Sequence, residues 1–389
     1  MIIRPLRPDE ARKLNAVSSI AFNFSADLEK EDKITSEVLG AFLDDGETIM
    51  SVIFPNNYKS NYCGEFLPCV GIGGVATLPE HRRGGGVRAI FDEIFRLAPE
   101  RGWATSYLYP FSYNYYRQYG YEKVMSRKSF NFPTSSLSTF ARDTNCTLYE
   151  GQPEIMADIK KVYYAFAAKF NIIFERGEYF HGASSTPHKD KRYTYVHYTN
   201  KTADAYVMFE IHGDTFVVNE LAYTDTAALA GILGFIRMYE GQVDSVSIRN
   251  QPMDSELEYM IRDYSNVSVR VEGGGMARVV LVEELLKKNA YPVSAGRFSL
   301  RVNDYLEYNR AVFVVEYTDG KATVVKKSYD SKFDIECDIP ALSRVMLGEC
   351  DFSLDAVSFM PGVSVIDTAG AEAFFRAFPR RRMCLYDWF

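Results

Sequence analysis

The sequence contains one turn whose residue types could hold an anion. Three successive glycines, Gly84, Gly85 and Gly86, are flanked by Arg83 and Arg88. Glycine opens backbone conformations that are closed to other residues and lets amide groups approach a ligand closely. Arginine adds positive charge and paired N–H donors. The turn therefore predicts a phosphate-binding site, and a solvated glycine-rich turn is the alternative interpretation.

A strand and a helix must position this turn. An apolar run over residues 69–77 predicts a strand that enters it, and an amphipathic run over residues 87–97 predicts a helix that leaves it. The first turn of such a helix has N–H groups without intrahelical partners, and its dipole favours an anion. The order of elements around the turn indicates an α/β fold with its ligand at the carboxyl edge of a sheet.

The spacing of the glycines distinguishes this turn from two common phosphate motifs. It matches neither Gly-x-x-x-x-Gly-Lys-Ser/Thr nor Gly-x-Gly-x-x-Gly. It is similar to the Arg-x-x-Gly-x-Gly/Ala pattern of the GNAT N-acetyltransferases, in which the turn holds the pyrophosphate of acetyl-CoA. Arg82 and Gly85 match the first two fixed positions, and Val87 stands where glycine or alanine is usual.

Transfer of an acetyl group from a thioester to an amine needs further groups. A backbone N–H near Val75 to Thr77 could polarise the carbonyl. Tyr116 is the candidate acid for the leaving thiolate, because a phenol with an ordinary pKa of about 10 stays protonated at neutral pH. Packing is the alternative role for Tyr116, since residues 113–121 contain four other tyrosines.

The end of the chain supplies a candidate base. Residues 385–389, Leu-Tyr-Asp-Trp-Phe, are more apolar than an ordinary frayed terminus. Burial would raise the pKa of the Phe389 α-carboxylate above its ordinary range of about 3.3–3.7 and make it a better base. A hydrophobic tail that docks only for stability is the alternative interpretation.

Composition limits the class of protein. A chain of 389 residues predicts two or three domains. The net charge of −7 argues against a nucleic-acid partner, which needs a basic face. The six cysteines form no Cys-x-x-Cys pair, and no His/Cys cluster has metal-ligand spacing. Scattered cysteines, no export signal and no long apolar run predict a cytoplasmic protein without a membrane span.

The rest of the chain predicts two more units. Residues 133–145 are rich in Ser and Thr and are interpreted as a linker. After it, the order hairpin, strand, turn, helix and strand returns, but Thr224-Asp225-Thr226 replaces the Arg/Gly turn. This predicts a second copy of the backbone that has lost its phosphate site, with coincidence as the alternative. The expected elements of the third unit are helices over 282–288, 340–347 and 369–378 and strands over 297–302, 311–317 and 322–327.

As a whole, the chain resembles the Eis (enhanced intracellular survival) acetyltransferases. Residues 79–88, Pro-Glu-His-Arg-Arg-Gly-Gly-Gly-Val-Arg, are similar to the family's Pro-x-His-Arg-Arg-x-Gly-x-x-Arg. Residues 116–121, Tyr-Arg-Gln-Tyr-Gly-Tyr, are similar to its Tyr-Gly-Arg-Phe-Gly-Tyr, and the chain ends in Phe. The resemblance implies an α/β (α+β) fold with two tandem GNAT-like domains and a sterol-carrier-protein-like domain. The ranges it implies are 1–143 for the catalytic domain, 146–280 for a second domain without a CoA site, and 281–389 for the third, whose C-terminal tail would reach the active site.

The same resemblance assigns roles to residues. Tyr116 would be the general acid and the Phe389 carboxylate the general base. The implied contacts with the acetyl group, pantetheine and pyrophosphate of acetyl-CoA are Val75, Ala76, Thr77, Arg83, Gly84, Gly85, Gly86, Val87, Arg88, Phe111 and Ser112. There are departures from the family pattern. Gly84 replaces an arginine, Gly86 and Val87 replace two leucines, and Phe111-Ser112 replaces a small-polar pair, which predicts a looser and less charged turn.

The expected function is an acetyl-CoA-dependent N-acetyltransferase that acts by direct attack in a ternary complex. Its acceptor would be an amine of an aminoglycoside-like or other cationic molecule. A lysine side chain of a protein or peptide is the alternative acceptor, and a non-catalytic acyl-CoA or lipid-binding protein is the alternative function. The resemblance also implies a homo-hexamer, and no metal is expected.

Overall fold

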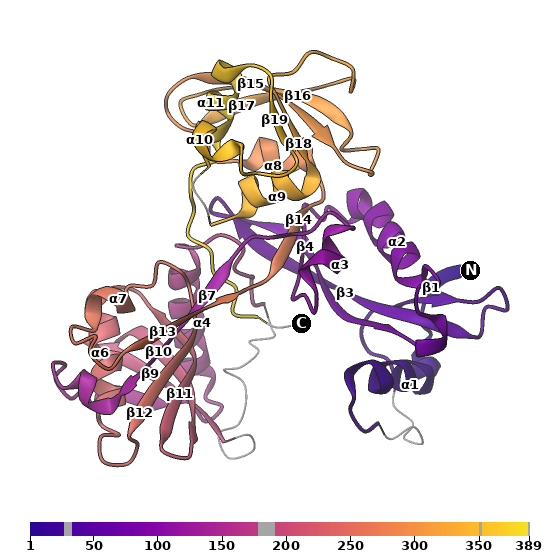
Figure 1. Ribbon diagram of the computed structural model, residues 1–389. Helices are drawn as coiled ribbons and strands as arrows, with labels where there is room; N and C mark the ends of the chain where they lie inside the picture. Colours follow the sequence, from indigo (N-terminus) through magenta and orange to yellow (C-terminus); the bar gives the residue numbers. More distant parts are fainter. Residues whose placement is uncertain (27–32, 178–190, 350–351, 388–389) are drawn as a thin grey trace. The chain divides into compact units, whose positions relative to one another are not determined.

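The computed structural model describes residues 1–26, 33–177, 191–349 and 352–387. The chain divides into two compact units (Figure 1). One contains residues 1–124 and 275–380, and the other contains residues 125–274 and 381–387. Among the described helices, none combines the length and the apolar character that crossing a membrane requires.

The first sheet belongs to the unit of residues 1–124 and 275–380, and its strand order is β1-β2-β3-β4-β5-β14-β6. β3 and β4 form a long antiparallel hairpin that turns at Cys63 and Gly64, both with positive φ, as two-residue hairpin turns require. β14 returns from the second unit and lies between β5 and β6. The bounds are β1 Ile2–Pro5, β2 Leu39–Phe42, β3 Ile49–Tyr62, β4 Glu65–Thr77, β5 Thr105–Leu108, β6 Glu122–Lys123 and β14 Met276–Val279.

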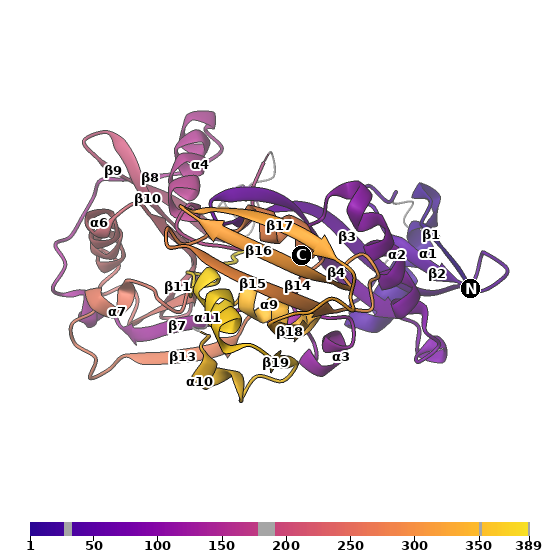
Figure 2. The same ribbon diagram turned by 90° about the horizontal axis from the view of Figure 1, so that it is seen from above.

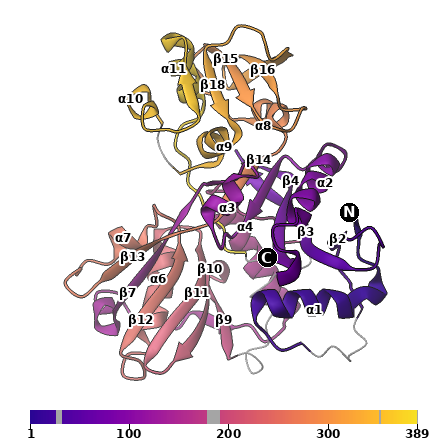
Figure 3. The ribbon, with the colours of Figure 1, turned by 45° about the vertical axis from the view of Figure 1, so that its right-hand side comes forward.

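Two helices cover the two faces of this sheet (Figure 3). One packs Leu14 and Val17 into one cluster of buried side chains, and the other packs Ile90, Phe91 and Ile94 into a second cluster. Their three- and four-residue spacing places each set on one helix face. The helices are α1 Ala11–Phe22 and α2 Gly86–Arg101, with the shorter α3 Tyr113–Arg117, η1 Pro8–Glu10 and η2 Pro79–His81.

The second unit repeats this plan around a sheet of order β13-β7-β12-β11-β10-β9-β8. β11 and β12 are parallel and are connected through α6, because parallel neighbours need a crossover. α4 and α6 both pack into one continuous core with this sheet. The bounds are β7 Ser126–Pro133, β8 Cys146–Leu148, β9 Arg192–Thr199, β10 Thr202–His212, β11 Thr215–Tyr223, β12 Ser245–Gln251, β13 Ser268–Gly273, α4 Pro153–Ala167, α6 Thr226–Arg237 and α7 Leu257–Met260.

The stretch predicted as a linker, residues 133–145, is folded onto the second sheet. It contains the short helix η3 Thr134–Leu137, and the side chain of Leu137 is fully buried. The hydroxyl of Thr134 donates to the carbonyl of Val243 at 3.0 Å. This stretch is therefore part of the second unit rather than a linker, because one buried apolar side chain outweighs a polar composition.

The last part of the first unit is built on a five-stranded sheet of order β17-β16-β15-β18-β19, whose strands lie side by side in Figure 2. Aromatic rings fill its core, with the ring centroids of Phe298 and Phe374 5.3 Å apart and those of Phe374 and Phe378 5.1 Å apart. The elements predicted from the sequence are confirmed here, and α8 has the expected bounds. The bounds are β15 Gly296–Asn303, β16 Ala311–Thr318, β17 Lys321–Lys327, β18 Ile335–Asp338, β19 Val363–Val365, α8 Val282–Lys288, α9 Ile339–Leu347, α10 Leu354–Val357 and α11 Thr368–Ala377.

Candidate active site

The two central strands of the first sheet part from each other. β4 pairs in parallel with β5 only from Cys69 to Gly71, and β4 then continues alone on that side to Thr77. Between Gly73 and Ala76 it also holds one more residue than its other neighbour, β3. Such a bulge leaves a residue out of the ladder. The parting and the bulge together expose backbone groups near Val75 to a ligand.

Glycine is required at the bulge. Gly74 has a φ of +56°, and a Cβ there would lie 2.2 Å from the ring of Phe54. Any side chain would therefore clash and would also strain the backbone. Gly74 was not singled out in the sequence, because the need for glycine arises only from its packing against β3.

The arginine- and glycine-rich turn folds as the sequence predicts. Gly85 is the N-cap of α2 with a φ of 81°, and Arg83 also has a positive φ of 66°. Gly86 lets the helix approach the sheet, since a Cβ there would lie 2.7 Å from the hydroxyl of Ser51. The first intrahelical bond of α2 is from the amide of Ala89 to the carbonyl of Gly85. The amides of residues 86–88 therefore stay available to an anion.

A cavity of about 940 Å³ lies at this place in the first unit. Its walls come from β4, the turn, the start of α2, the end of α1 and the region of α3. The sequence-predicted residues among its lining are Val75, Ala76, Thr77, Arg83, Gly85, Gly86, Val87, Arg88 and Phe111. Arg82, which matches the first fixed position of the GNAT pattern in the sequence, also lines the cavity. The lining residues without a role predicted from the sequence are Ala21, Phe22, Ser51, His81, Tyr115, Gln118 and Tyr119.

Two predicted cofactor residues, Gly84 and Ser112, are not among the described residues that line the cavity. Gly84 donates its amide to the carbonyl of His81 at 3.1 Å and shapes the turn. The hydroxyl of Ser112 accepts a hydrogen bond from the amide of Tyr115 at 3.4 Å and caps α3. Both residues therefore hold elements that carry lining residues.

The cavity is positively charged on its turn side. Arg82, Arg83 and Arg88 line it and are exposed, and the lining includes no Asp or Glu of the described chain. Arg88 donates to the side chain of Gln118 at 3.1 Å, and its guanidinium lies 4.8 Å from the ring centroid of Tyr119. These contacts fix the position of one cation at the helix N-terminus, which suits a phosphate group.

Tyr116 lies one layer behind the cavity wall. It is 3% exposed, and it is not one of the described residues that line the cavity. Its ring meets the lining rings of Phe111 and Tyr115 edge-on, at centroid distances of 5.4 and 5.1 Å. Burial raises the pKa of Tyr116 above its ordinary value, so the phenol stays protonated.

The second candidate, Phe389, lies outside the described residues. The tail that precedes it, residues 381–387, belongs to the second unit. There the hydroxyl of Tyr386 donates to the carbonyl of Leu221 at 2.9 Å, and Arg176 donates to Asp387 at 2.7 Å. The described tail is therefore docked rather than frayed.

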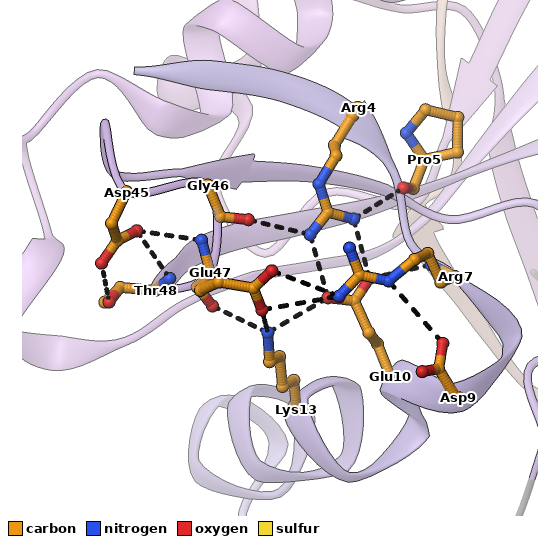
Figure 4. A network of polar contacts seen from close by, with 10 residues as sticks. All are labelled: Arg4, Pro5, Arg7, Asp9, Glu10, Lys13, Asp45, Gly46, Glu47 and Thr48. Atoms are coloured by element: carbon orange, nitrogen blue, oxygen red, sulfur yellow. Dashed lines mark hydrogen bonds and ion pairs between the residues drawn. The ribbon is translucent and has the colours of Figure 1, made fainter.

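A network of charges holds α1, whose last residues line the cavity (Figure 4). Glu10 accepts from Arg4 at 2.7 and 2.9 Å and from Lys13 at 3.1 Å, and Lys13 also donates to Glu47 in the turn between β2 and β3. The hydrogen bond from Arg4 is the main reason why the pKa of the nearly buried Glu10 falls to about 2. This carboxylate therefore ties the start of α1 to β1 and to the turn.

Comparison with known families fits this geometry. Residues 2–124 match the acetyltransferase (GNAT) domain, and residues 174–279 match a second model of the acetyltransferase (GNAT) domain. The sterol carrier protein domain matches residues 282–385. The chain therefore contains two acetyltransferase (GNAT) domains followed by a sterol carrier protein domain. It is an acyltransferase, and GNAT domains use acetyl-CoA.

Solved structures similar to this chain share its whole fold. An Enterococcus faecalis protein described as a probable N-acyltransferase is 24% identical, with 100% of this chain and 99% of that chain covered and a TM-score of 0.87. A GCN5-related N-acetyltransferase from Anabaena variabilis is 19% identical, with both chains covered at 100% and a TM-score of 0.84. Eis1 from Mycobacterium abscessus is 19% identical, with both chains covered at 100% and a TM-score of 0.79. No curated protein matches the sequence.

In the second GNAT domain the two parallel strands part in the same way, but side chains occupy the space beyond the point where they part. β11 pairs with β12 only as far as Val218, and it holds one extra residue relative to β10. The side chain of Asp225 caps α6 by accepting from the amide of Ala228 at 2.9 Å. Lys169 donates to the carbonyl of Thr224 at 2.6 Å, and Tyr386 of the tail bonds to β11 itself. Residues of the chain therefore occupy the positions that stay open in the first domain.

Proposed function

We propose that this protein transfers the acetyl group of acetyl-CoA to an amine of a cationic substrate, by direct attack in a ternary complex. The observation that carries the proposal is the cavity between the parted end of β4 and the N-terminus of α2, with three arginines in its wall. The residues fit an acyl-CoA in their chemistry, since strand amides, helix amides and guanidinium groups suit a carbonyl and a pyrophosphate.

The proposed roles follow the chemistry of each group. Acetyl-CoA supplies the activated acyl group. The backbone of Val75, Ala76 and Thr77 orients the acyl and pantetheine part, and the turn from Arg83 to Arg88 binds the pyrophosphate. Phe111 lines the cavity, while Gly84 and Ser112 support the turn and α3.

Two proton transfers complete the proposed mechanism. The phenol of Tyr116 gives a proton to the leaving thiolate, and its raised pKa keeps that proton in place until it is needed. The α-carboxylate of Phe389 takes a proton from the attacking amine. Because Tyr116 lies behind the wall, its donation needs a small movement of Phe111 or Tyr115, or a water between them.

The aromatic lining supports a cationic acceptor. Phe22 is 53% exposed and Phe111 is 73% exposed, although both line the cavity. An ammonium group is attracted to such ring faces. We therefore propose an aminoglycoside-like amine as the acceptor and a lysine side chain of a peptide as the alternative, in a cytoplasmic homo-hexamer.

Release of CoA and acetylated product should be measured together, by a thiol assay and by mass spectrometry. The full chain is given acetyl-CoA with a deoxystreptamine aminoglycoside, or with a lysine-containing peptide. Acetylated aminoglycoside supports the proposal, and product from the peptide alone supports the alternative. No product from either acceptor, with CoA bound, would reject both acceptor classes.

A further inference from the structure

We propose that Arg278 of β14 is a positioning residue for the cofactor cavity, acting through the backbone of Tyr119. This inference rests on the proposed acetyl-CoA site. Arg278 is fully buried, and its side chain has an exposed fraction of 0%. A charge is rarely buried without a defined set of partners. The partners of Arg278 lie on two sides of it.

On one side Arg278 is held by the domain that matches a sterol carrier protein. One terminal nitrogen donates to both carboxylate oxygens of Asp304 at 2.7 and 2.8 Å. Asp304 also accepts from the amide side chain of Asn309 at 2.9 Å, and Asn309 in turn donates to the carbonyl of Val280 at 2.8 Å. This buried ion pair anchors one end of the guanidinium.

On the other side Arg278 reaches the wall of the cavity. Its second terminal nitrogen donates to the backbone carbonyl of Tyr119. The next residue, Gly120, makes this approach possible, because a Cβ there would lie 1.6 Å from that nitrogen. Gly120 also has a φ of +87°. The missing side chain at Gly120 and its positive φ therefore both accommodate the side chain of Arg278, which comes from a distant part of the sequence.

Tyr119 transmits the position of Arg278 to the predicted phosphate site. Its ring lines the cavity, lies 4.3 Å from the ring of Phe91 and carries the guanidinium of Arg88 at 4.8 Å. The neighbouring Gln118 accepts from Arg88 at 3.1 Å. The segment 118–120 is thus the support of Arg88, and Arg278 holds that support from behind. Displacing the segment 118–120 would move the guanidinium of Arg88 in the cofactor site, without contact with the acyl group of the cofactor.

The test is the affinity of the full chain for CoA, measured by isothermal titration, with the KM for acetyl-CoA and kcat measured in parallel. Arg278→Lys keeps one buried charge but loses the planar fork that spans Asp304 and Tyr119. We expect the Kd for CoA and the KM to rise about tenfold, with kcat at saturation within about twofold of the unmodified protein.

Ser343→Ala is the matched control. Ser343 is fully buried, accepts from the amide of Val279 at 2.8 Å on the same strand, and donates to the carbonyl of Ile339 at 2.7 Å. This variant should lower the melting temperature but leave the Kd for CoA unchanged. An equal rise of Kd in both variants would mean that Arg278 has only a structural role, and so would an unchanged Kd in a folded Arg278→Lys.

A second variant covers the case in which Arg278→Lys does not fold. Asp304→Asn keeps Arg278 and the shape of its partner but weakens the ion pair, and it should raise the Kd for CoA in the same direction by a smaller factor. No rise in this variant would overturn the proposal. The unmodified protein separates the two claims, because CoA binding without acetyl transfer counts against the proposed acceptors and leaves the Arg278 comparison intact.

Discussion

The two GNAT domains of this chain use one backbone plan in two ways. In each, a central strand with one extra residue parts from its parallel neighbour before a helix begins. The first domain leaves the place beyond the parting open, with Gly85 at the helix cap and a cavity in front of it. The second fills the same place with Asp225, Lys169 and Tyr386.

The difference shows that the parting of the strands is not by itself a cofactor site. A carboxylate such as Asp225 at the helix N-terminus satisfies the free amides and repels a phosphate. A lysine bonded to the turn carbonyls and a tail side chain bonded to the strand take up the remaining polar groups. An open phosphate site needs the opposite residue types, namely glycines at the helix cap and arginines whose charge stays exposed.

The largest effect is expected from Tyr116→Phe, because this variant removes the proposed proton donor from the open site of the first domain. We expect kcat to fall about 100-fold or more, with little change in the KM for acetyl-CoA. Because burial raises the pKa of Tyr116, kcat of the unmodified protein should not decline through loss of this proton below about pH 10. Steady-state kinetics across pH would check both statements.

Tyr121→Phe is the control for this variant. Its hydroxyl bonds to Ser106 at 2.6 Å in the same aromatic cluster, away from the cavity lining. Equal losses of kcat in the two variants would show that Tyr116 acts by packing.

Gly85→Asp would give the first domain the cap of the second. A Cβ at Gly85 meets none of the described atoms within 4 Å, but the positive φ of 81° adds a backbone strain that a matched variant must share. A carboxylate beside the pyrophosphate should weaken CoA binding by roughly 100-fold, the order expected for like charges a few ångströms apart. Gly85→Asn has the same shape without the charge and should cost far less affinity. Similar Kd values for the two variants in titration would refute the electrostatic explanation.

Glu10→Gln tests how the first domain keeps its α1 wall in place. The lowered pKa of about 2 means that the carboxylate stabilises the fold above its ordinary pKa of 4.5, and that this stability is lost as the pH falls toward 2. We expect the variant to lose roughly 2 kcal/mol of unfolding free energy at pH 7. Urea denaturation at several pH values should show this difference shrinking below about pH 4. A difference that stays constant with pH would contradict the role of the charge.

Asp225→Ala should have the smallest effect. Loss of an N-cap costs about 1 kcal/mol of unfolding free energy, which thermal denaturation would detect. CoA should still bind with one equivalent per chain, because Lys169 and the tail continue to fill the second site. Asp225→Asn keeps a cap and serves as the control. A second equivalent of CoA bound to Asp225→Ala would show that the cap alone closed this site.

The sequence by itself determined the local chemistry of the first site. Glycines between arginines specify a turn that approaches a ligand, and the apolar periodicity that follows specifies α2. Regular elements with strong patterns were also predictable, such as α8 and the strands β15 to β17. These features depend on neighbours in the chain, so a reading of local residue types finds them.

Only the tertiary structure decided which distant residues complete the site. The roles of Gly74 and Gly120 come from Phe54 and Arg278, which approach them from other strands. Tyr119 and Gln118 became part of the cavity wall because Arg88 folds back over them. The placement of Tyr116 behind that wall and the folding of residues 133–145 onto the second sheet are likewise packing outcomes. Such contacts depend on where the chain returns in space, and the spacing of residues along one segment contains no record of that.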